Sequence, residues 1–545
     1  MNFKKLIIIG LLLIGLYARC ANLGQKVYTV DEVRGIFRAS GYQQTELIEN
    51  AYTGTLITND QLQAYQTPTA AHPVGDAMAA FANNPEHPPL YYLLMRFSLQ
   101  AFKAPVASRW LAVVLSLLLL PAMYWLCIEL FVSKTPASKT LRSKTLPDQK
   151  EELIPTAISG PAVGWSAIAL IAISPFHVLL AQEARQYTLW ALLLAVSSAF
   201  LLQALRENRW KQWLAYGVTA ALGMYSHLFF TWVLMSHGLY VLIVEKFRLS
   251  QRLLRYALIS TGVVITFLPW AWVIVSRASQ LKKTTRWAST YKTSIIERAQ
   301  YWLHNIGIGF IDFEWPVSFT NPLSYILLGA VVYSIYLLYR HTPKRVWLFV
   351  VLLMGISAAA QIVPDILSDG RRSLLPRYSL TVYIGIAIAV GYAMAHAFNN
   401  PNRKLQQAGV AALLIGGVVS SLLIPQSLGW AKGSSTIAID VSPKINQVEQ
   451  PIIISDTEYF YMLSLSYYVD PSTRYVLLNP EQPESYASAL TQLPADSNLL
   501  VYSPSNELAD AIQSSSSLES DITPLEENQS NRRGKLYQAR RVASS

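Results

Sequence analysis

Charged residues are scarce in this sequence of 545 residues, because Asp, Glu, Lys and Arg make up only 14% of it. Soluble proteins usually carry about 25% of these residues. Hydrophobic residues reach 52% and gather in long apolar runs that end near Ile424. This distribution excludes an ordinary soluble protein and predicts a chain that crosses a membrane several times.

Cysteine is nearly absent as well. Cys20 and Cys127 lie in or beside apolar runs and lack the spacing of a metal site, so the sequence indicates neither a disulfide framework nor a cysteine zinc site. Arg19 before Cys20 does not fit a lipoprotein cleavage site. Lys4 and Lys5 with the apolar run after them resemble a signal peptide, but the many later spans favour an uncleaved first helix.

Eleven apolar runs are near the roughly 17–25 residues that a membrane-spanning helix needs. They predict an all-α polytopic membrane domain over residues 1–425. The expected spans are Leu6–Ala21, Trp110–Phe131, Val163–Leu180, Tyr187–Leu205, Trp213–Tyr225, Leu228–Val244, Tyr256–Val275, Leu323–Tyr339, Val346–Val363, Tyr378–Ala397 and Ala408–Ile424.

Basic residues in the short loops predict the orientation of these spans. Lys4 and Lys5 hold the N-terminus in the cytoplasm, and the basic loops between later spans then lie on the same side. An odd number of spans places the C-terminus outside the cell membrane. The net charge of +11 follows from this topology and does not indicate a nucleic-acid partner. The loops in question are 134–150, 206–211, 246–255 and 340–345.

Three longer segments, 22–109, 277–321 and 364–377, are then expected at the outer face of an inner membrane. The apolar stretch Pro88–Phe102 in the first of them is short, and Arg96 interrupts it. A crossing at this stretch would move the later basic loops outside. We therefore expect a helix that lies along the membrane surface.

The sequence after Ala431 has the character of a soluble protein. Strands are expected at Pro451–Ser455, Tyr475–Leu478 and Leu499–Tyr502, with helical or connecting stretches between them. This alternation predicts a small extracytoplasmic α/β domain over residues 431–545. It contains no Gly-rich phosphate loop, so no nucleotide site is expected. The connecting stretches are Ser464–Tyr468, Glu484–Gln492 and Asn506–Ser514.

Two neighbouring acids, Asp31 and Glu32, follow the first expected span closely. Thr29 and Glu32 have the T-x-x-E spacing of a capping box, in which the acid only caps a helix. Alternatively, a carboxylate at this place accepts a proton from an acceptor hydroxyl. A partly apolar cavity at the membrane surface would then raise its pKa toward neutrality.

Further candidate residues are histidines and an acid in the outer segments. Glu86 and His87 precede two prolines that stiffen the backbone. Glu86 can ligate a divalent cation, and His87 can bind a metal or a sugar; a proline-rich helix entry is the alternative. His227 lies between two spans and His304 in the second outer segment, and either is also explained as a packed histidine.

Charges at the expected span entrances form the last group. Glu183 and Arg185 lie between two apolar runs, and residues two apart do not face each other, so each is expected to have another partner. Arg371, Arg377 and Tyr378 precede a later span. Arginines outside the membrane oppose the usual charge bias, which favours an anionic partner such as a lipid phosphate. Anchoring to lipid headgroups is the alternative.

Taken in order, these motifs resemble the polyprenyl-phosphate-dependent membrane glycosyltransferases of the protein mannosyltransferase and aminoarabinose transferase type, which are glycosyltransferase family 39-like. The resemblance covers Met1–Ile424 and rests on the order of the motifs and the membrane face that each reaches. The motifs are DE at Asp31 and Glu32, EHPPLYY at Glu86–Tyr92, EARQYTLW at Glu183–Trp190, LPWAW at Leu268–Trp272 and LPRYSL at Leu375–Leu380.

The resemblance implies a glycosyltransferase C-type fold and an inverting transfer from a polyprenyl phosphate sugar to an acceptor lipid, glycan or protein. Asp31 would be the catalytic base, with Glu32 as the next candidate. Relatives often carry an Asp near Glu183, placed slightly differently. The remaining roles are donor phosphate binding for Arg377, Tyr378, Arg185 and Arg371, sugar or acceptor binding for His87, Glu183 and His227, and a divalent ion (Mg, Mn or Zn) for Glu86 and His304.

Three other functions fit the membrane class less well. A transporter or flippase of lipid-linked glycans would carry charges within its spans and often repeated halves, whereas the acids here gather in outer segments. A polymerase or ligase of surface polysaccharide needs no base near the first span. A membrane sensor would leave the motifs at Asp31 and Glu86 unexplained. The sequence therefore favours an enzyme.

Overall fold

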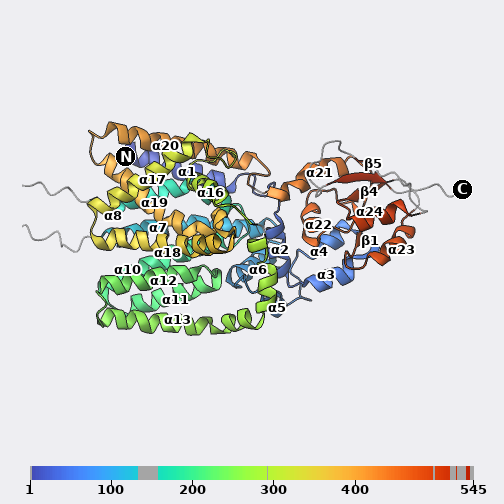
Figure 1. The fold of residues 1–545 in the computed structure, drawn as a ribbon, viewed down its shortest axis with the longest axis horizontal. Coiled ribbons are helices and arrows are strands. Elements are labelled where there is room, and N and C mark those ends of the chain that lie inside the picture. The colour runs from blue at the N-terminus through green and yellow to red at the C-terminus, as the bar shows by residue number, and fades with distance from the viewer. Residues whose placement is uncertain are drawn as a thin grey trace, which may run out of the picture.

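The structure is a computed structural model that describes residues 3–132, 158–290, 292–431, 433–494, 498–515, 523–524 and 535–539. A bundle of long helices forms one end of the molecule, and a part that mixes strands and short helices forms the other (Figure 1). The basic loop expected at 134–150 lies outside the described residues.

Within the described residues, seven helices are long and apolar enough to cross a membrane. The chain is thus a multi-pass membrane protein, as predicted. These candidate spans are α7 (Ala107–Phe131), α10 (Tyr187–Glu207), α13 (Gln251–Ser276), α17 (Pro322–His341), α18 (Lys344–Ser368), η2 with α19 (Pro376–Ser379 and Leu380–Phe398), and α20 with η3 (Lys404–Leu423 and Ile424–Gln426).

A bent pair of helices forms an eighth candidate span. α8 (Gly160–Ala172) and α9 (Pro175–Ala181) meet at an angle of 64°. Pro175 starts α9, and a proline cannot donate the backbone hydrogen bond that would continue α8. The sequence predicts one span over Val163–Leu180, and the proline explains why the chain bends there.

Three other predicted spans are present as helices but fall short of a clear crossing. α1 (Phe3–Cys20) has 18 residues and includes the basic residues Lys4, Lys5 and Arg19. α11 (Trp210–Ser226) has 17 residues, and α12 (Phe230–Val244) has 15. The total of eleven crossings therefore stays a prediction.

Short helices fill the segment between the first span and α7. α6 (Leu90–Phe102) has 13 residues, about 20 Å at 1.5 Å per residue, which is too short for a bilayer core of about 30 Å. This length supports the predicted surface helix. Arg96 is buried within α6 and donates to the carbonyl oxygen of Ala39 at 2.8 Å. The others are α2 (Val30–Ser40), α3 (Gln44–Ala51), α4 (Asn59–Ala64) and α5 (Val74–Ala82).

The second of the segments expected at the outer face, 277–321, contains α14 (Ala278–Thr284), α15 (Trp287–Thr290) and α16 (Ile295–Ile308). Arg298 of α16 is buried and donates from Nη2 to the carboxylate of Asp369 at 2.9 Å. This ion pair fixes α16 beside the turn that carries η1 (Arg372–Leu374) and the predicted phosphate-binding arginines.

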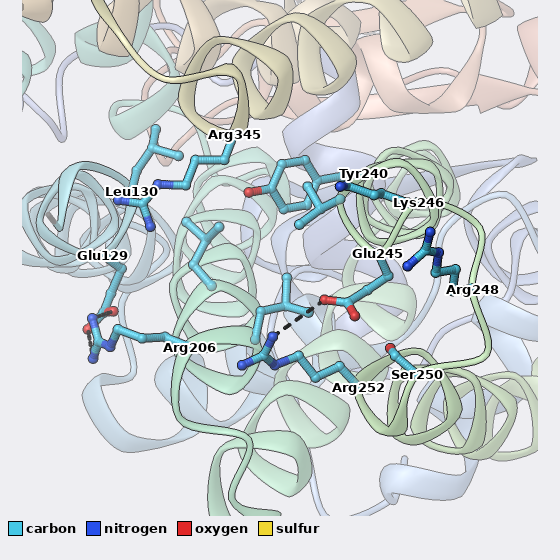
Figure 2. A pocket seen from close by; sticks show the side chains of 13 residues that line it. Glu129, Leu130, Arg206, Tyr240, Glu245, Lys246, Arg248, Ser250, Arg252 and Arg345 are labelled. Atoms are coloured by element: carbon cyan, nitrogen blue, oxygen red, sulfur yellow. Dashed lines mark hydrogen bonds and ion pairs between the residues drawn. The ribbon is translucent and has the colours of Figure 1, made fainter. Parts of the chain in front are cut away.

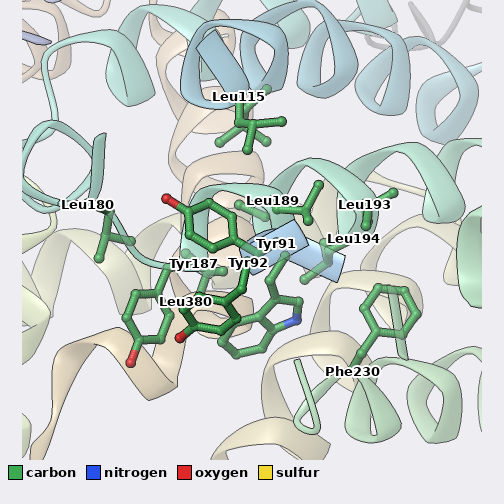
Figure 3. Close-up of a cluster of buried hydrophobic side chains, with 14 of the residues drawn as sticks. Tyr91, Tyr92, Leu115, Leu180, Tyr187, Leu189, Leu193, Leu194, Phe230 and Leu380 are labelled. Atoms are coloured by element: carbon green, nitrogen blue, oxygen red, sulfur yellow. The ribbon is translucent and has the colours of Figure 1, made fainter. Parts of the chain in front are cut away.

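The core of the bundle is aromatic where α6 meets the membrane helices. Tyr91 and Tyr92 of α6 lie among leucines of α7 and α10 and Leu380 of α19 (Figure 3). Both tyrosines are buried, and Tyr92 donates its hydroxyl hydrogen to Gln186 at 2.7 Å. Burial of large aromatic rings stabilises this contact, so α6 is a fixed wall of the bundle.

The C-terminal part contains the three predicted strands, β2 (Ile452–Ser455), β3 (Arg474–Leu478) and β4 (Leu499–Tyr502). β2 pairs in parallel with both neighbours, as expected for strands joined by helices. β6 (Leu536–Ala539) and β5 (Thr523–Pro524) add antiparallel strands beyond β4. The helices are α21 (Ile437–Ile445), α22 (Tyr459–Leu465), α23 (Tyr486–Thr491) and α24 (Asn506–Gln513), with 3₁₀ turns η4 (Gly433–Thr436) and η5 (Pro483–Ser485).

The sheet has a sixth strand that the sequence did not predict. β1 (Thr53–Thr58) comes from the segment 22–109 and pairs antiparallel with β3. In this pairing Leu56 lies opposite Val476. The observed order is β1-β3-β2-β4-β6-β5. The α/β part is therefore built from two distant pieces of the chain. The first outer segment contributes a strand to this part and also contacts the helical bundle.

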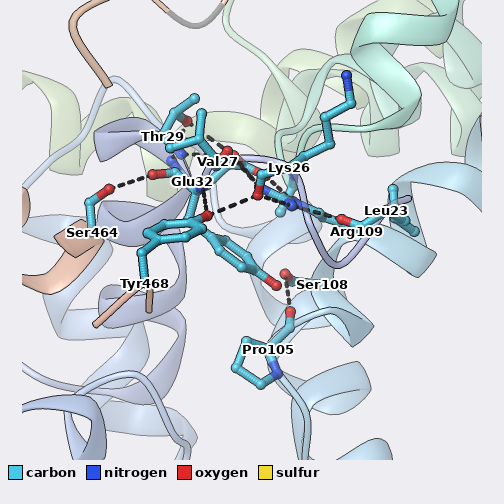
Figure 4. A network of polar contacts seen from close by, with 12 residues as sticks. Leu23, Lys26, Val27, Thr29, Glu32, Pro105, Ser108, Arg109, Ser464 and Tyr468 are labelled. Atoms are coloured by element: carbon cyan, nitrogen blue, oxygen red, sulfur yellow. Dashed lines mark hydrogen bonds and ion pairs between the residues drawn. The ribbon is translucent and has the colours of Figure 1, made fainter. Parts of the chain in front are cut away.

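A buried ion pair joins the first outer segment to α7 (Figure 4). Arg109 Nε donates to Glu32 Oε1 at 2.8 Å and Arg109 Nη2 to Glu32 Oε2 at 3.0 Å. Both side chains are fully buried, with 0% exposure. The remaining Arg109 N–H groups donate to the carbonyl oxygens of Leu23, Lys26 and Val27 at 2.8–2.9 Å. Every polar group of this buried pair is thereby satisfied.

We predict that Arg109→Ala lowers the free energy of unfolding by about 3–5 kcal/mol, because it leaves the Glu32 carboxylate buried without its partner. Thermal unfolding of the purified protein in detergent measures the loss. Arg209→Ala, at an exposed arginine, is the matched control and should change stability by less than about 0.5 kcal/mol. Equal melting temperatures for the two variants would contradict the assigned role.

Candidate functional site

Most of the predicted site residues lie around one cavity of about 950 Å³. Its wall combines α2, the turns before α6, α10 and α12, the η1–η2 turn and the start of α22, so it lies where the helical bundle meets the α/β part (Figure 1). The predicted residues on this wall are Asp31, Glu86, His87, Arg185, His227, Arg371, Arg377 and Tyr378.

The first turn of α2 is fixed by the predicted capping box. Thr29 Oγ1 accepts from the backbone N–H of Glu32 at 3.2 Å, and Glu32 Oε2 accepts from the N–H of Thr29 at 3.0 Å. This confirms the T-x-x-E prediction. It also places Asp31 in the first turn, on the same face as Arg34 and Arg38, which follow at helical spacing.

Two arginines from distant segments converge on Asp31. Arg185 Nη2 lies 3.8 Å and Arg377 Nη2 lies 3.5 Å from Asp31 Oδ2. Arg185 Nη1 also donates to the Asp31 carbonyl oxygen at 3.0 Å. The sequence predicts that Arg185 pairs with a residue other than Glu183, and the structure identifies that partner as Asp31.

The electrostatic environment of Asp31 differs from the expectation. Burial disfavours its charged form, but the guanidinium groups of Arg185 and Arg377 outweigh burial and hold the pKa of Asp31 well below its ordinary value. The sequence predicts a raised pKa, and that prediction is wrong because it did not include two nearby cations. Asp31 is therefore a carboxylate throughout the neutral pH range.

Both arginines keep a buried N–H group without a partner. Within the described residues, Arg185 Nε and Arg377 Nε form no hydrogen bond. Leaving a buried charged donor unsatisfied is costly, so these groups favour an anionic ligand in the cavity. The wall supports the same chemistry, with seven basic residues and three acidic ones. They are Arg34, Arg38, Arg185, Lys283, Arg371, Arg372 and Arg377, with Asp31, Glu86 and Glu458.

The far wall carries neutral polar groups. Gln186 links Tyr92 to His87, whose Nδ1 lies 3.4 Å from Gln186 Nε2. Burial, followed by the charge of Arg185, holds the pKa of His87 well below its ordinary value, so the imidazole is neutral. Glu86 Oε2 is buried and has no hydrogen-bond partner among the described residues. The Gln186 amide and the neutral His87 imidazole offer donors and acceptors that suit sugar hydroxyls.

His227 forms a second neutral group on the wall. Its ring stacks on Trp190 with centroids 4.4 Å apart, and Nδ1 accepts from the backbone N–H of Phe229 at 3.0 Å. Because Nδ1 is an acceptor, the ring proton lies on Nε2, which is left as a donor. His227 is packed against Trp190, as the alternative explanation expects, and it also lines the large cavity, which the predicted sugar-binding role requires.

Glu32 and Glu183 lie elsewhere. Glu32 is fully buried and bonded to Arg109, Thr29 and the backbone N–H of Ala184, which argues against the prediction that it is the next candidate base. Glu183 lines a smaller cavity of about 260 Å³. Asp31, Arg34 and Arg377 line that cavity too, so they separate two spaces that both reach the Asp31 carboxylate.

The predicted metal pair is not brought together. Glu86 lines the large cavity, whereas His304 of α16 lines a different one with Asp312 and Trp315. In the part of the chain that the structure describes, no three His, Cys, Asp or Glu residues are grouped as metal ligands would be. The hypothesis of one ion shared by Glu86 and His304 is not supported, because the two side chains belong to separate sites.

Several wall residues were missed at the sequence level. Arg34 and Arg38 follow Asp31 by three and seven residues, a helical pattern that could have identified them. Glu458 and Phe460 come from the C-terminal part, and no local sequence signal indicates them. Arg34 Nη2 lies 2.5 Å from Glu458 Oε1, and the Arg34 guanidinium carbon lies 5.0 Å from the Phe460 ring centroid.

Comparisons with known proteins agree with this architecture. Residues 156–272 match the family described as dolichyl-phosphate-mannose-protein mannosyltransferase. No curated protein matches the chain in sequence. The crystal structure of ArnT from Cupriavidus metallidurans bound to undecaprenyl phosphate is similar, with a TM-score of 0.54 and 13% identity, covering 99% of this chain and 98% of that one. Its apo state gives a TM-score of 0.54 at 11% identity, covering 98% and 97%.

These findings confirm the predicted resemblance and the predicted fold. The matched stretch contains the Glu183–Trp190 and Leu268–Trp272 motifs, and the fold of ArnT extends over nearly the whole chain, including the C-terminal part. The chain therefore has the glycosyltransferase C-type fold of ArnT, and the two comparisons together indicate a membrane glycosyltransferase.

We predict that Asp31 stabilises the fold only where it is ionised. Its folded pKa is depressed, so its contribution is present above the unfolded pKa near 3.9 and is lost as the pH falls through the folded pKa. Asp31→Asn should therefore melt at a lower temperature than the wild type at pH 5–8. The corresponding difference in the free energy of unfolding is at most about 1 kcal/mol, because the Asp31 side chain is 35% exposed. A difference that grows below about pH 4 would contradict this assignment.

Proposed function

We propose that this protein transfers a sugar from a polyprenyl-phosphate-linked donor to an acceptor hydroxyl, with inversion at the anomeric carbon, on the outer face of the membrane. The observation that carries the proposal is the pair of arginines at Asp31. Each keeps a buried N–H group without a partner and lies next to a carboxylate that can accept a proton. ArnT, which shares the fold, binds undecaprenyl phosphate.

The donor phosphate binds Arg377 and Arg185 in the large cavity. Both guanidinium groups contact Asp31 through Nη2 and keep Nε for another anion. Arg371 and Tyr378 line the same wall and complete the phosphate site. Negative charge grows on the phosphate as the bond to the sugar breaks, so fixed cations here lower the barrier.

Asp31 accepts the proton of the acceptor hydroxyl as this oxygen attacks the anomeric carbon and the phosphate leaves with the bonding electrons. The carboxylate borders both cavities, so the acceptor and the donor can approach it from two sides. A single displacement with inversion places the attacking oxygen and the leaving phosphate on opposite faces of the anomeric carbon, so the acceptor would occupy the smaller cavity and the donor the larger one. His87 and His227 bind sugar hydroxyls on one side, and Glu183 binds the acceptor on the other. Glu86 Oε2 offers an oxygen ligand to a sugar hydroxyl or to a divalent ion.

We predict that loss of the base and loss of the phosphate clamp both slow transfer but differ in their effect on donor binding. Asp31→Asn keeps the shape of the side chain and removes the base, so transfer of labelled sugar from a polyprenyl phosphate donor should fall by about 10²–10⁴-fold. Donor binding should survive. Arg377→Ala should weaken donor binding and transfer together, and Arg377→Lys should restore only part of each, because a point charge cannot reproduce a bidentate contact.

The matched control for the base is Asp60→Asn. Asp60 is an exposed carboxylate in α4 of the same outer segment, and its change should leave transfer unaffected. Full transfer activity in well-folded Asp31→Asn would remove Asp31 from the mechanism. If Asp31→Asn and Asp60→Asn reduced transfer by the same factor, Asp31 would likewise have no specific role.

We predict that the α/β part is outside and the short loop between α10 and α11 is inside, as the basic residues indicate. Gln513→Cys and Lys211→Cys, both at exposed positions, are compared in a chain whose two native cysteines are replaced by alanine. A membrane-impermeant maleimide should label Gln513→Cys in intact cells and Lys211→Cys only after permeabilisation. The reverse pattern would overturn both the topology and the outer-face reaction.

A further inference from the structure

Another polar cavity, about 320 Å³ in volume (Figure 2), lies near the C-terminal ends of α7 and α10, away from Asp31. The buried Arg109 lies in the first turn of α7, and the last turn of α7 contributes Glu129 to this cavity. α10 likewise starts at Tyr187 in the large cavity and contributes Arg206 here. Tyr187 and Arg206 are 19 residues apart on α10, which separates the two sites by about 29 Å at 1.5 Å per residue, close to the thickness of a bilayer core.

The lining of this cavity combines a basic group of residues with an apolar group, which we call its apolar floor. Five basic residues and two acidic ones line the cavity, and they come from α7, α10, α13, α18 and the loop between α12 and α13 (Figure 2). The charged residues are Arg206, Lys246, Arg248, Arg252, Arg345, Glu129 and Glu245. The apolar floor consists of Leu130, Leu202, Leu205, Tyr240 and Val244.

The acids neutralise only part of this charge. Glu129 forms an ion pair with Arg206, and Arg252 Nη1 lies 3.7 Å from Glu245 Oε1. Lys246 and Arg248 form no ion pair within the described ranges of the chain. Among the described residues, the excess positive charge therefore belongs to Lys246, Arg248 and Arg345, in a concave site between helices.

The loop between α12 and α13 adds apolar groups at the rim. Phe247 is 68% exposed and Leu249 is 83% exposed, one on each side of Arg248. Lys246 and Phe247 both have left-handed backbone conformations, with φ of 55° and 56°, which are costly for residues other than glycine. A loop held in this shape, with exposed apolar and basic side chains in alternation, is typical of a segment at a membrane surface.

We propose that this cavity binds the phosphate-bearing headgroup of an anionic membrane lipid, on the membrane face opposite Asp31. Guanidinium groups match phosphate oxygens with paired hydrogen bonds. The apolar floor and the lipid-facing side of α13, where Leu254 and Leu258 are 55% and 61% exposed, provide a surface for the acyl chain. A free phosphate would use the basic wall alone, so the apolar features favour a lipid.

Binding of this lipid ties several helices together. Lys246 and Arg248 belong to the loop between α12 and α13, and Arg345 belongs to α18, so a single phosphate group that contacts them offsets their mutual repulsion. The lipid therefore stabilises the end of the bundle that lies farthest from the reaction. The proposal does not depend on the sugar-transfer activity, because none of these residues lines the large cavity.

The test uses the full chain in phosphatidylcholine nanodiscs with and without phosphatidylglycerol. Lipid retention in native mass spectrometry and the melting temperature are measured. Arg248→Gln with Arg252→Gln should weaken phosphatidylglycerol binding by at least about tenfold and abolish its stabilising effect. The matched control, Arg209→Gln with Lys211→Gln, removes two basic residues near the end of α10 that do not line the cavity, and should bind like the wild type.

Three results would overturn the proposal. The first is a wild type that shows no preference for phosphatidylglycerol over phosphatidylcholine. The second is an equal loss of binding in both double variants, which would indicate diffuse surface charge. The third is stabilisation by inorganic phosphate equal to that by the lipid, which assigns the site to a soluble anion. If the cavity double variant fails to fold, Lys246→Gln carries the same test, because it breaks no ion pair.

Discussion

The buried pair of Glu32 and Arg109 is the interaction on which the site depends. Glu32 accepts from the backbone N–H of Ala184, and Asp31 and Arg185 are the chain neighbours of these two residues. Both members of the Asp31–Arg185 contact are thus held one residue away from the same carboxylate. A buried ion pair is weak evidence for net stability, but its directed hydrogen bonds fix geometry, because any displacement leaves a charge without compensation. The loop residues of the site therefore have the positional precision of the bundle core.

The same arrangement makes the strength of the proposed base depend on the donor. Arg185 and Arg377 hold Asp31 ionised but weakly basic. A donor phosphate on these arginines would offset their positive charge, so the pKa of Asp31 would rise toward its ordinary value. The carboxylate would then accept a proton more readily when a donor is present than when it is absent. The sequence predicted a raised pKa from burial alone. In the structure the effect of burial on the pKa of Asp31 is opposed by two cations, and a bound phosphate would reduce the effect of those cations.

The sequence contained most of the fold and part of the site. Apolar runs predicted the long helices, the runs at Pro451, Tyr475 and Leu499 predicted the central strands, and Thr29–Glu32 predicted a helix start, because each of these signals is local. β1 could not be predicted, because its TGTLIT sequence has little apolar periodicity and its partner β3 lies about four hundred residues later. The shared metal site stays a prediction without support, because sequence order does not state which cavity a side chain enters, and Glu86 and His304 line different ones.

The C-terminal part shows why the resemblance in the membrane motifs was an incomplete guide to the site. No motif of the tail entered that resemblance, yet Glu458 and Phe460 form part of the cavity wall and hold Arg34, one turn after Asp31. Ser464 also donates to the carbonyl oxygen of Tyr28 at 2.6 Å, directly before the capping box. The first outer segment is therefore fixed from the bundle by Arg109 and from the α/β part by α22. Arg185 and Arg377, which contact Asp31, come from the bundle, whereas α22 and Glu458 act on the site through Arg34.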